Sequence, residues 1–299
     1  MRVLNISGLS KRYGKITAVD NLSLEVGQGM SFGILGPNGS GKTTTLGIIL
    51  GIIHQNSGSF TWFGGRYGKW HRHHIGALLE TPNFYPYLNA VDNLRLIAHI
   101  RRVQEPRIDH LLELVNLHRR RHSRFRTFSL GMKQRLAIAG AMIGDPEVLI
   151  FDEPTNGLDP QGIAEVRQTL REIAAMGKTI IMASHILDEV EKVCSHVAII
   201  KEGRLLASGT VGAIISDDML VEVSAENLDG LKSAMGQYPP VRRIEEEEGK
   251  LILYLSEEVP PAQINQVAFR QGVALSHLRV VKKSLESEFL EITGKKDAN

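Results

Sequence analysis

The residues from Gly36 to Thr43, GPNGSGKT, have the composition and spacing of a phosphate-binding loop. Its glycines permit backbone conformations that direct successive N–H groups toward an anion. An apolar segment typical of a buried strand precedes the loop, and a helical pattern follows it, so that the amino end of a helix would favour bound phosphate. Lys42 would place a positive charge between the β and γ phosphates of a nucleotide, and the Thr43 hydroxyl could ligate Mg²⁺. A glycine turn that arises by chance would not satisfy both contexts.

An acidic motif supplies the chemistry that a bound triphosphate requires. The segment VLIFDEP, Val148 to Pro154, is predicted to be a buried strand that ends in two carboxylates. Ligands bind at the carboxyl ends of the strands in parallel sheets, which is where Asp152 and Glu153 would lie. We expect Asp152 to hold Mg²⁺ through water and Glu153 to polarise the attacking water. An acidic pair at a strand end is common in plain turns, but beside a phosphate loop it indicates a nucleoside triphosphatase.

Three further segments restrict which kind of nucleoside triphosphatase this chain can be. In FSLGMKQR, residues 128–135, Ser129 and the amides around Gly131 form a second helix start that is suited to an anion. The segment NGLDP, residues 156–160, follows the acidic strand directly. His185 ends the next predicted strand, where its imidazole could reach a γ-phosphate.

The elements that must position these motifs alternate between strands and helices. Residues 3–9 and 19–26 have the alternation of half-buried strands, and the later strands are apolar throughout. Such alternation of apolar strands with helices implies a parallel sheet covered on both faces. Between about residues 88 and 143 the apolar period is helical, with Asn89 as an N-cap, so we predict a helical insert in the α/β chain.

The pattern changes beyond residue 212. From MLVEVSA to LSHLRVVKKS the predicted order is strand, helix, strand, strand, helix, strand, which is typical of a small ferredoxin-like domain. We therefore predict two domains. Residues 1–212 carry the phosphate-binding motifs, and residues 213–299 form an accessory α+β domain.

Composition agrees with two ordinary globular units. The chain has 299 residues, of which 42% are hydrophobic and 23% are charged. The net charge of +2 gives no global argument for nucleic-acid binding, and the single cysteine, Cys194, excludes an intramolecular disulfide framework. The amino-terminal segment becomes polar too early for a signal peptide, and the apolar runs are too short for a membrane helix. If a membrane matters to this protein, we expect a partner to supply it.

The motif set and its order resemble the ATP-binding subunit of ATP-binding-cassette (ABC) transporters over about residues 2–212. By this resemblance GPNGSGKT is the Walker A motif, VLIFDE the Walker B motif, SLGMKQ the signature, GLDP the D-loop with Asp159, and His185 the switch histidine. The resemblance implies a P-loop NTPase fold with a parallel-sheet core, an N-terminal antiparallel β part and the helical insert. Tyr13 lies where the family stacks an aromatic ring on adenine. The implied nucleotide-binding residues are Tyr13, Gly36, Pro37, Asn38, Gly39, Ser40, Gly41, Lys42, Thr43 and Thr44.

The signature departs from its common form, LSGGQ. Leu130 replaces the first glycine, and Met132 and Lys133 follow the second. Ser129 and Gly131, whose hydroxyl and backbone contact phosphate in the family, are kept. We therefore expect the segment Ser129, Leu130, Gly131 and Met132 to be competent.

The resemblance also implies an assembly. In the family two such subunits sandwich two ATP molecules, and each signature faces the phosphate loop of the other subunit. One Walker A motif and one signature imply a homodimer or a pairing with a second ABC subunit. Lys42, Mg²⁺ and Ser129 of the opposite subunit would stabilise charge on the γ-phosphate, while Glu153 and His185 would order the attacking water.

The implied function is an ATPase at the cytoplasmic face of the membrane that energises separate membrane-spanning subunits. The segments ETPNFYPYL and FSLGMKQRL look most like those of exporters in the multidrug, bacitracin-resistance and lantibiotic-immunity group. The alternative is a soluble ABC ATPase that acts on ribosomes or nucleic acid. Such proteins usually carry two cassettes or a long coiled-coil insertion, and neither is visible here.

Glu80 is an unusual residue in this pattern. It ends the apolar run of GALLETPNFYPYL, residues 76–88, at a position where the family has a glutamine that touches Mg²⁺ and the attacking water. A glutamate offers only acceptors and a charge, whereas a glutamine offers a carbonyl and two donors. We expect Glu80 to ligate Mg²⁺ together with Thr43 and Asp152, and to make hydrolysis more dependent on bound Mg²⁺. A plain surface cap is the alternative.

Two basic segments carry weaker signals. The run HRRRHSRFR, residues 118–126, could be a nucleic-acid patch, but one phenylalanine is its only aromatic residue. We favour a solvated connector or a face near the dimer seam and anionic lipid, and expect no nucleic-acid partner. The run HRHH, residues 71–74, could suggest a metal site, but we favour a solvated turn because no acidic residue or cysteine is nearby in the sequence.

Overall fold

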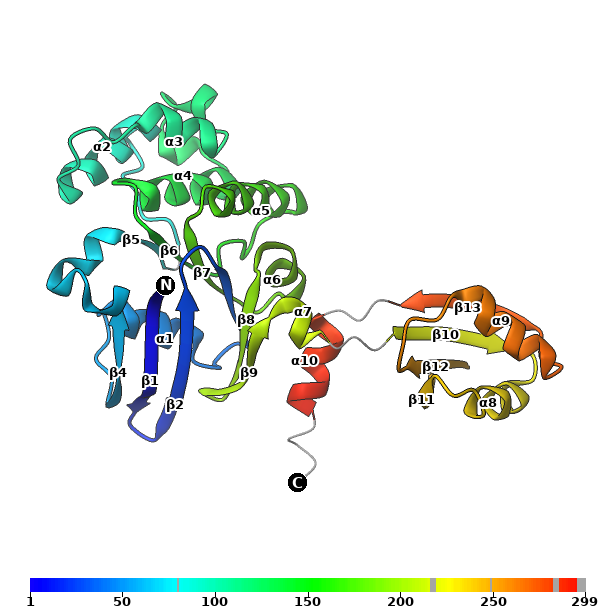
Figure 1. Cartoon of the computed structure of the whole chain (residues 1–299). Helices are drawn as coiled ribbons and strands as arrows, with labels where there is room; N and C mark the ends of the chain where they lie inside the picture. The colour runs from blue at the N-terminus through cyan, green and yellow to red at the C-terminus, as the bar shows by residue number, and fades with distance from the viewer. Residues whose placement is uncertain (80, 216–218, 248, 282–284, 295–299) are drawn as a thin grey trace. The chain divides into compact units, whose positions relative to one another are not determined.

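The computed structural model describes residues 1–299 except 80, 216–218, 248, 282–284 and 295–299. The chain divides into two compact units, Met1–Val211 and Gly212–Asn299 (Figure 1). Among the described residues, no helix is long and apolar enough to cross a membrane.

The first unit contains two sheets and their covering helices. Its strands are β1 (Arg2–Tyr13), β2 (Ile16–Gly27), β3 (Ser31–Leu35), β4 (Ser57–Trp62), β5 (Ile75–Leu78), β6 (Val148–Asp152), β7 (Thr179–Ser184), β8 (His196–Lys201) and β9 (Arg204–Thr210). Its α-helices are α1 (Lys42–Ile49), α2 (Ala90–Arg101), α3 (Ile108–Leu114), α4 (Leu130–Met142), α5 (Pro160–Ala175), α6 (Leu187–Val193) and the start of the chain's short α7 (Val211–Ile214). Short 3₁₀ helices are η1 (Phe63–Gly65), η2 (Gly68–His74), η3 (His118–Arg120) and η4 (Phe125–Thr127).

The central sheet has the strand order β5-β6-β7-β3-β8-β9, and all of its pairings are parallel except that of β9 with β8. Every residue of β3, β6 and β7 is buried, as expected for strands that are covered on both faces. The predicted parallel-sheet core is therefore confirmed.

The N-terminal sheet is antiparallel, with the order β2-β1-β4, as predicted. A single hydrophobic core includes Leu4 and Leu22 of this sheet, Ile34 of β3, and Leu46 and Ile48 of α1. The helix that begins at the phosphate loop is therefore fixed by the burial of its apolar side chains.

The helical insert contains α2, α3 and α4. Asn89 caps α2 as predicted, because its side chain accepts a hydrogen bond from the Asp92 amide at 2.8 Å. Helix α4 approaches β5 so closely that a Cβ on Gly76 would lie 2.0 Å from the carbonyl oxygen of Ala141. A glycine at this strand position thus allows the insert to pack onto the central sheet.

The second unit contains β10 (Met219–Ala225), α8 (Leu228–Gly236), β11 (Val241–Glu247), β12 (Lys250–Leu255), α9 (Pro261–Arg270), β13 (Leu275–Val281) and α10 (Leu285–Gly294). Its antiparallel sheet has the order β11-β12-β10-β13. This is the order of the ferredoxin-like fold that was predicted. Buried apolar residues of the strands and of α8 and α9, among them Val221, Leu231, Leu253 and Ile264, form a separate core.

The segment GSFTWFGG, residues 58–65, has the sequence pattern of a strand between turns, but the strand ends before residue 65. Strand β4 ends at Trp62, and Phe63, Gly64 and Gly65 all have positive φ angles, of 52°, 60° and 84°. Such angles are incompatible with an extended strand, so the chain turns into η1 and then η2.

Candidate nucleotide site

The candidate site lies at the carboxyl ends of three neighbouring strands. In the sheet β6, β7 and β3 are adjacent, although they lie far apart in the sequence. The phosphate loop follows β3, Asp152 ends β6 with Glu153 directly after it, and His185 follows β7. The parallel arrangement therefore brings all three predicted motifs to the same edge.

The phosphate loop passes close to other backbone segments, which is why glycines are needed. A Cβ on Gly36 would lie 2.2 Å from the carbonyl oxygen of Ile200. Gly41 has a φ of 100°, and its Cβ would lie 2.2 Å from the carbonyl oxygen of Ala18. Gly41 is also the N-cap of α1, so the helix begins directly at the loop with its amide groups available to an anion.

Lys42 is the cation of this site and is only 5% exposed. Its ammonium donates to the carbonyl oxygens of Gly36 at 2.8 Å and Pro37 at 3.1 Å, and it lies 3.5 Å from Glu153 Oε1. The ammonium is therefore held inside the loop. A nucleotide phosphate bound there would compete with these acceptors for it.

Glu153 has an unusual backbone conformation. Its φ is 48°, in the left-handed region, where side-chain-bearing residues are uncommon and often belong to active sites. Its amide donates to the Ala183 carbonyl oxygen of β7 at 2.9 Å. The His185 ring contacts Glu153 Oε2 through Nδ1 at 2.8 Å. Glu153 thus presents one oxygen to Lys42 and the other to His185.

Thr43, Asp152 and Glu153 line one cavity of about 300 Å³. A hydroxyl and carboxylates are hard oxygen ligands of the kind that Mg²⁺ prefers, so this donor set fits the ion. Among the described residues, no group of three or more His, Cys, Asp or Glu side chains forms a metal cluster.

The signature and D-loop residues begin two helices. Ser129 caps α4 by accepting from the Met132 amide at 3.3 Å, and Asp159 caps α5 by accepting from the Gly162 amide at 2.8 Å. Leu130 is exposed and borders the 300 Å³ cavity of its own chain, which Ser129, Gly131 and Met132 do not line. The roles of these residues toward a second subunit stay predictions.

The remaining predicted nucleotide-binding residues lie around the loop or on the neighbouring hairpin. Pro37, Asn38 and Gly39 are exposed, Ser40 is buried, and Thr44 lies in the first turn of α1. Tyr13 ends β1 with an exposed ring, and the Lys11 ammonium lies 5.0 Å from its centre, so adenine stacking there stays a prediction. Glu80 lies outside the described residues.

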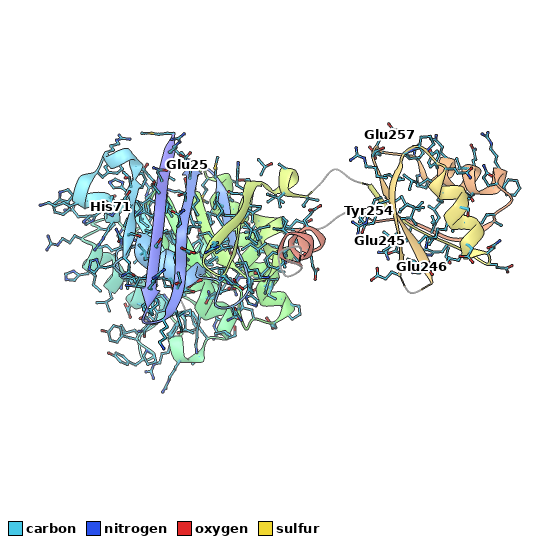
Figure 2. The ribbon with its side chains drawn as sticks, turned by 90° about the horizontal axis from the view of Figure 1, so that it is seen from below. Glu25, His71, Glu245, Glu246, Tyr254 and Glu257 are labelled. Atoms are coloured by element: carbon cyan, nitrogen blue, oxygen red, sulfur yellow. The ribbon has the colours of Figure 1, made fainter. Side chains whose placement is uncertain are left out.

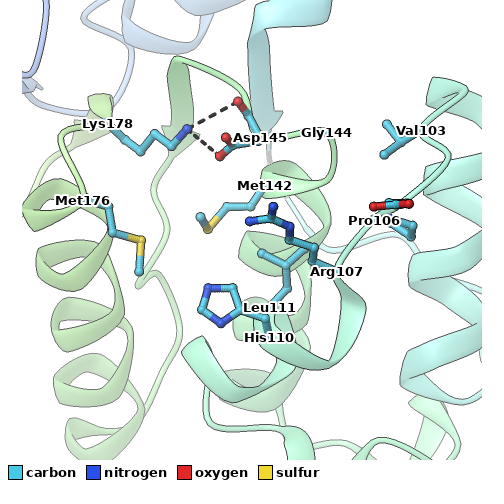
Figure 3. A pocket seen from close by; sticks show the side chains of 11 residues that line it. Val103, Pro106, Arg107, His110, Leu111, Met142, Gly144, Asp145, Met176 and Lys178 are labelled. Carbon is cyan, nitrogen blue, oxygen red and sulfur yellow. Dashed lines mark hydrogen bonds and ion pairs between the residues drawn. The ribbon is translucent and has the colours of Figure 1, made fainter.

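A second cavity, of about 490 Å³, is separate from this chemistry (Figure 3). Arg107, His110, Met142 and Met176 line it, and the ion pair of Lys178 with Asp145 closes one side, with a distance of 2.6 Å. Because none of the predicted site residues lines this larger cavity, its volume does not mark it as the nucleotide site.

Glu189 is a residue that the sequence analysis did not identify. Its side chain is 2% exposed, and it accepts a hydrogen bond from the hydroxyl of Thr155, two residues after Glu153. Burial raises the pKa of the Glu189 carboxyl, and the contact with Thr155 acts in the opposite direction. Helix α6, which follows His185, is thereby tied to the loop that carries Glu153.

A sequence signal for Glu189 did exist. Ile186, Glu189, Val190 and Val193 have the spacing of one helix face, which places a carboxylate among apolar residues. A buried carboxyl needs hydrogen-bond partners, and here the Thr155 hydroxyl donates to one of its two oxygens.

Comparison with known proteins identifies the class. A family model described as ABC transporter matches residues 19–156. The bacitracin transport ATP-binding protein BcrA of Bacillus licheniformis is 35% identical over 298 residues, which cover 98% of this chain and 97% of that protein. The Nod factor export ATP-binding protein I of Cupriavidus pinatubonensis is 34% identical over 303 residues, which cover 98% of this chain and 91% of the relative.

A solved structure described as the ATP binding subunit of an ABC transporter matches with a TM-score of 0.63 and 32% identity, over 71% of this chain and 91% of that one. This chain therefore belongs to the ATP-binding proteins of ABC transporters and is an ATPase of that family. The resemblance inferred from the motifs is confirmed. The relatives above match nearly the whole chain, so the likeness includes the second unit.

Replacement of Glu153 by glutamine separates hydrolysis from binding. We expect Glu153→Gln to lower kcat for ATP by roughly 10²–10⁴-fold, the usual contribution of a general base. Affinity for ATP should change little, because the loop and Lys42 remain intact. Steady-state turnover and equilibrium nucleotide binding measure the two effects, with Lys42→Ala as the variant that loses affinity. A Glu153→Gln chain that keeps most of its turnover would contradict the assignment.

Glu189 should make stability depend on pH. Burial raises the pKa of the Glu189 carboxyl in the folded chain. Between the ordinary glutamate pKa and this raised value, the folded chain keeps a proton that the unfolded chain has released. The contribution of Glu189 to the free energy of unfolding therefore falls as pH rises through that window. We expect Glu189→Gln to keep a hydrogen bond with Thr155 and to gain stability relative to the wild type as pH rises. Glu189→Leu should lose about 1–3 kcal/mol, because the buried Thr155 hydroxyl loses its partner.

Thermal unfolding of the three chains across this pH range provides the measurement. Parallel curves for wild type and Glu189→Gln at every pH would show that the carboxyl does not titrate as its burial requires.

Proposed function

We propose that this chain is the ATP-hydrolysing subunit of an exporter and works at the cytoplasmic face of a membrane through separate membrane-spanning subunits. The observation that carries this proposal is the convergence of Lys42, Glu153 and His185 at one sheet edge, in a chain whose relatives are named for transport and export. Those names do not favour the alternative of a ribosome- or nucleic-acid-directed ATPase.

ATP and Mg²⁺ are the proposed ligands of the site. Thr43 and Asp152, with Glu80, would hold the ion, which neutralises charge on the β and γ phosphates when it is bound. The loop amides and Lys42 orient the triphosphate. Glu153 accepts the proton of the attacking water, and its contact with His185 at 2.8 Å orients the carboxylate for that task.

A second ABC subunit would complete the site. The start of α4 at Ser129 is a helix amino end of the kind that binds phosphate, and Ser129 is exposed. Since Ser129 and Gly131 do not line the cavity of their own chain, they are available to the nucleotide of a partner. A homodimer or a pair with another ABC subunit provides this arrangement.

A groove beside β5 is the proposed contact for a membrane-spanning subunit. It has a volume of about 260 Å³ and lies between β5, the loop of Pro82 and Phe84, and helices α2 and α4, with Ile97 and Gly140 in its lining. Pro82 and Phe84 follow Glu80 by two and four positions in the sequence. We propose an apolar segment of the membrane-spanning subunit as the occupant, because the lining is largely apolar.

The groove yields a test of the partner. We expect Phe84→Ala to reduce co-purification with a membrane-spanning subunit, while the basal ATPase rate changes little and the melting temperature falls only by the loss of the Phe84–Phe125 contact. Phe269→Ala, at a residue that is 74% exposed on α9, is the control and should co-purify normally. Purification of the wild-type chain in a complex that holds no membrane protein would count against the whole proposal.

Glu80 yields a test of the metal. Because a carboxylate binds Mg²⁺ more strongly than an amide does, we expect Glu80→Gln and Glu80→Ala to require more Mg²⁺ for half-maximal ATPase activity and to lower the maximal rate. Titration of activity with Mg²⁺ at saturating ATP measures both quantities. If Glu80→Ala changed neither the rate nor the Mg²⁺ requirement, Glu80 would not be a Mg²⁺ ligand, and the alternative of a plain surface cap would hold.

A further inference from the structure

The segment Arg66–His74, RYGKWHRHH, displays a tryptophan at the surface of the first unit. Trp70 is 62% exposed, whereas the other tryptophan of the chain, Trp62, is 4% exposed and donates to the Ile49 carbonyl oxygen at 2.8 Å. One tryptophan thus contributes to the core and the other does not. Exposed tryptophan is enriched at interfaces where one part of the ring meets an apolar environment and the N–H stays hydrated.

The inner side of this tryptophan segment is firmly held. The rings of Tyr67 and His74 stack with centroids 3.6 Å apart and planes 8° apart. The Tyr67 hydroxyl donates to Glu147 at 2.6 Å, His74 Nδ1 lies 3.1 Å from the same carboxylate, and the Glu147 amide donates to the His74 carbonyl oxygen. The expectation of a wholly solvated turn is therefore wrong for His74, because Glu147 is near it in space although distant in sequence.

The outer side of the segment is basic and aromatic. The Lys69 ammonium lies 5.6 Å from the centre of the Trp70 ring, and the His73 and Trp70 rings are 5.6 Å apart. Arg66 and Arg72 are exposed, and His71 lies at the outer surface of the unit (Figure 2). The segment contains no Asp or Glu, so its charge is positive although the whole chain is nearly neutral.

We propose that the Arg66–His74 segment binds the anionic lipid headgroups of a membrane surface directly. Tryptophan partitions into the interface between headgroups and acyl chains, and lysine and arginine are attracted to the negative surface of lipids such as phosphatidylglycerol. Because the inner side of the segment is already ordered, binding through the Trp70 ring loses little backbone conformational entropy.

The position of the segment supports a lipid surface as its partner. The Arg101 side chain lines the groove that we assign to the membrane-spanning subunit, and its guanidinium donates to the carbonyl oxygens of His73 at 3.2 Å and Ile75 at 3.1 Å. The tryptophan segment therefore borders that groove. Lipid binding itself depends neither on the groove nor on ATP hydrolysis, so it can be tested on the isolated chain.

The second basic run, residues 118–126, serves as an internal comparison and decides between its two predicted roles, a solvated connector or a face near the dimer seam and anionic lipid. Arg119 and Arg120 are exposed there, but the aromatic residue of the run, Phe125, is buried. This run has charge without an exposed aromatic ring. Substitution of Arg119 and Arg120 by glutamate thus changes the net charge as much as substitution of Lys69 and Arg72 by glutamate. The two pairs lie at different places in the same unit.

The chain contains its own probe for the experiment. Of its two tryptophans, only Trp70 is exposed, so a change in tryptophan fluorescence reports on this segment. We expect the purified full chain to show a blue shift and increased emission with vesicles of phosphatidylcholine and phosphatidylglycerol, and little change with phosphatidylcholine alone. Co-sedimentation with the same vesicles should weaken as salt is raised.

Variants locate the contact. We expect the double variant Lys69→Glu/Arg72→Glu to lower co-sedimentation with the anionic vesicles by about tenfold or more, because each basic residue near an anionic surface contributes about 1 kcal/mol. Trp70→Ala should also lower co-sedimentation, because it removes the ring that partitions into the interface. The control Arg119→Glu/Arg120→Glu should bind at least half as well as the wild type. ATPase activity of Trp70→Ala and Lys69→Glu/Arg72→Glu should match that of the wild type.

Three outcomes would overturn the proposal. The first is unchanged emission with anionic vesicles. The second is an equal loss of binding in the control variant, which would show attraction to net charge alone. The third is a Lys69→Glu/Arg72→Glu chain that binds vesicles normally but loses its membrane-spanning subunit, which would assign the segment to a protein contact.

Discussion

The carboxylate of Glu153 is the point on which the rest of the site depends. One oxygen lies 3.5 Å from the Lys42 ammonium and the other 2.8 Å from His185 Nδ1. Three segments that are distant in sequence thereby meet at one side chain. The Glu153 backbone is in the left-handed region, and its amide donates to the Ala183 carbonyl oxygen of β7. Such backbone strain persists only where the surroundings determine it, and here the neighbouring strand β7 does so.

The same edge of the sheet is joined to two helix starts. Gly41 begins α1 within the phosphate loop, and Asp159 begins α5 a few residues beyond Glu153. Thr155, between Glu153 and Asp159, is bound to the buried Glu189 of α6. Displacement of one of these segments should therefore affect the others.

Much of this arrangement could be predicted from the sequence because the relevant physics is local. Glycine spacing in residues 36–43 determines a loop that a helix must follow, and wholly apolar strands such as 148–152 require cover on both faces. The cap at Asn89 and the strand order of the second unit follow from equally short patterns. These expectations are confirmed by the structure.

Contacts between distant segments could not be predicted in the same way. The pairing of Glu189 with Thr155 and that of His74 with Glu147 join residues that only the fold brings together. The difference in exposure between Trp62 and Trp70, eight positions apart, depends on a turn at Phe63–Gly65 that the local pattern presented as a continuing strand. Residue types alone therefore indicated the chemistry of the site but not the groups that support it.

A double-mutant cycle on Glu153 and His185 tests most directly whether the two act as a unit. Single-turnover ATP cleavage would be measured for the wild type, Glu153→Gln, His185→Ala and the double variant, all with saturating nucleotide and Mg²⁺. If the 2.8 Å contact orients the catalytic carboxylate, the double variant will be about as slow as the slower single variant, because residues that act together give non-additive losses. Losses that multiply in the double variant would show that the two residues act independently and would contradict this account.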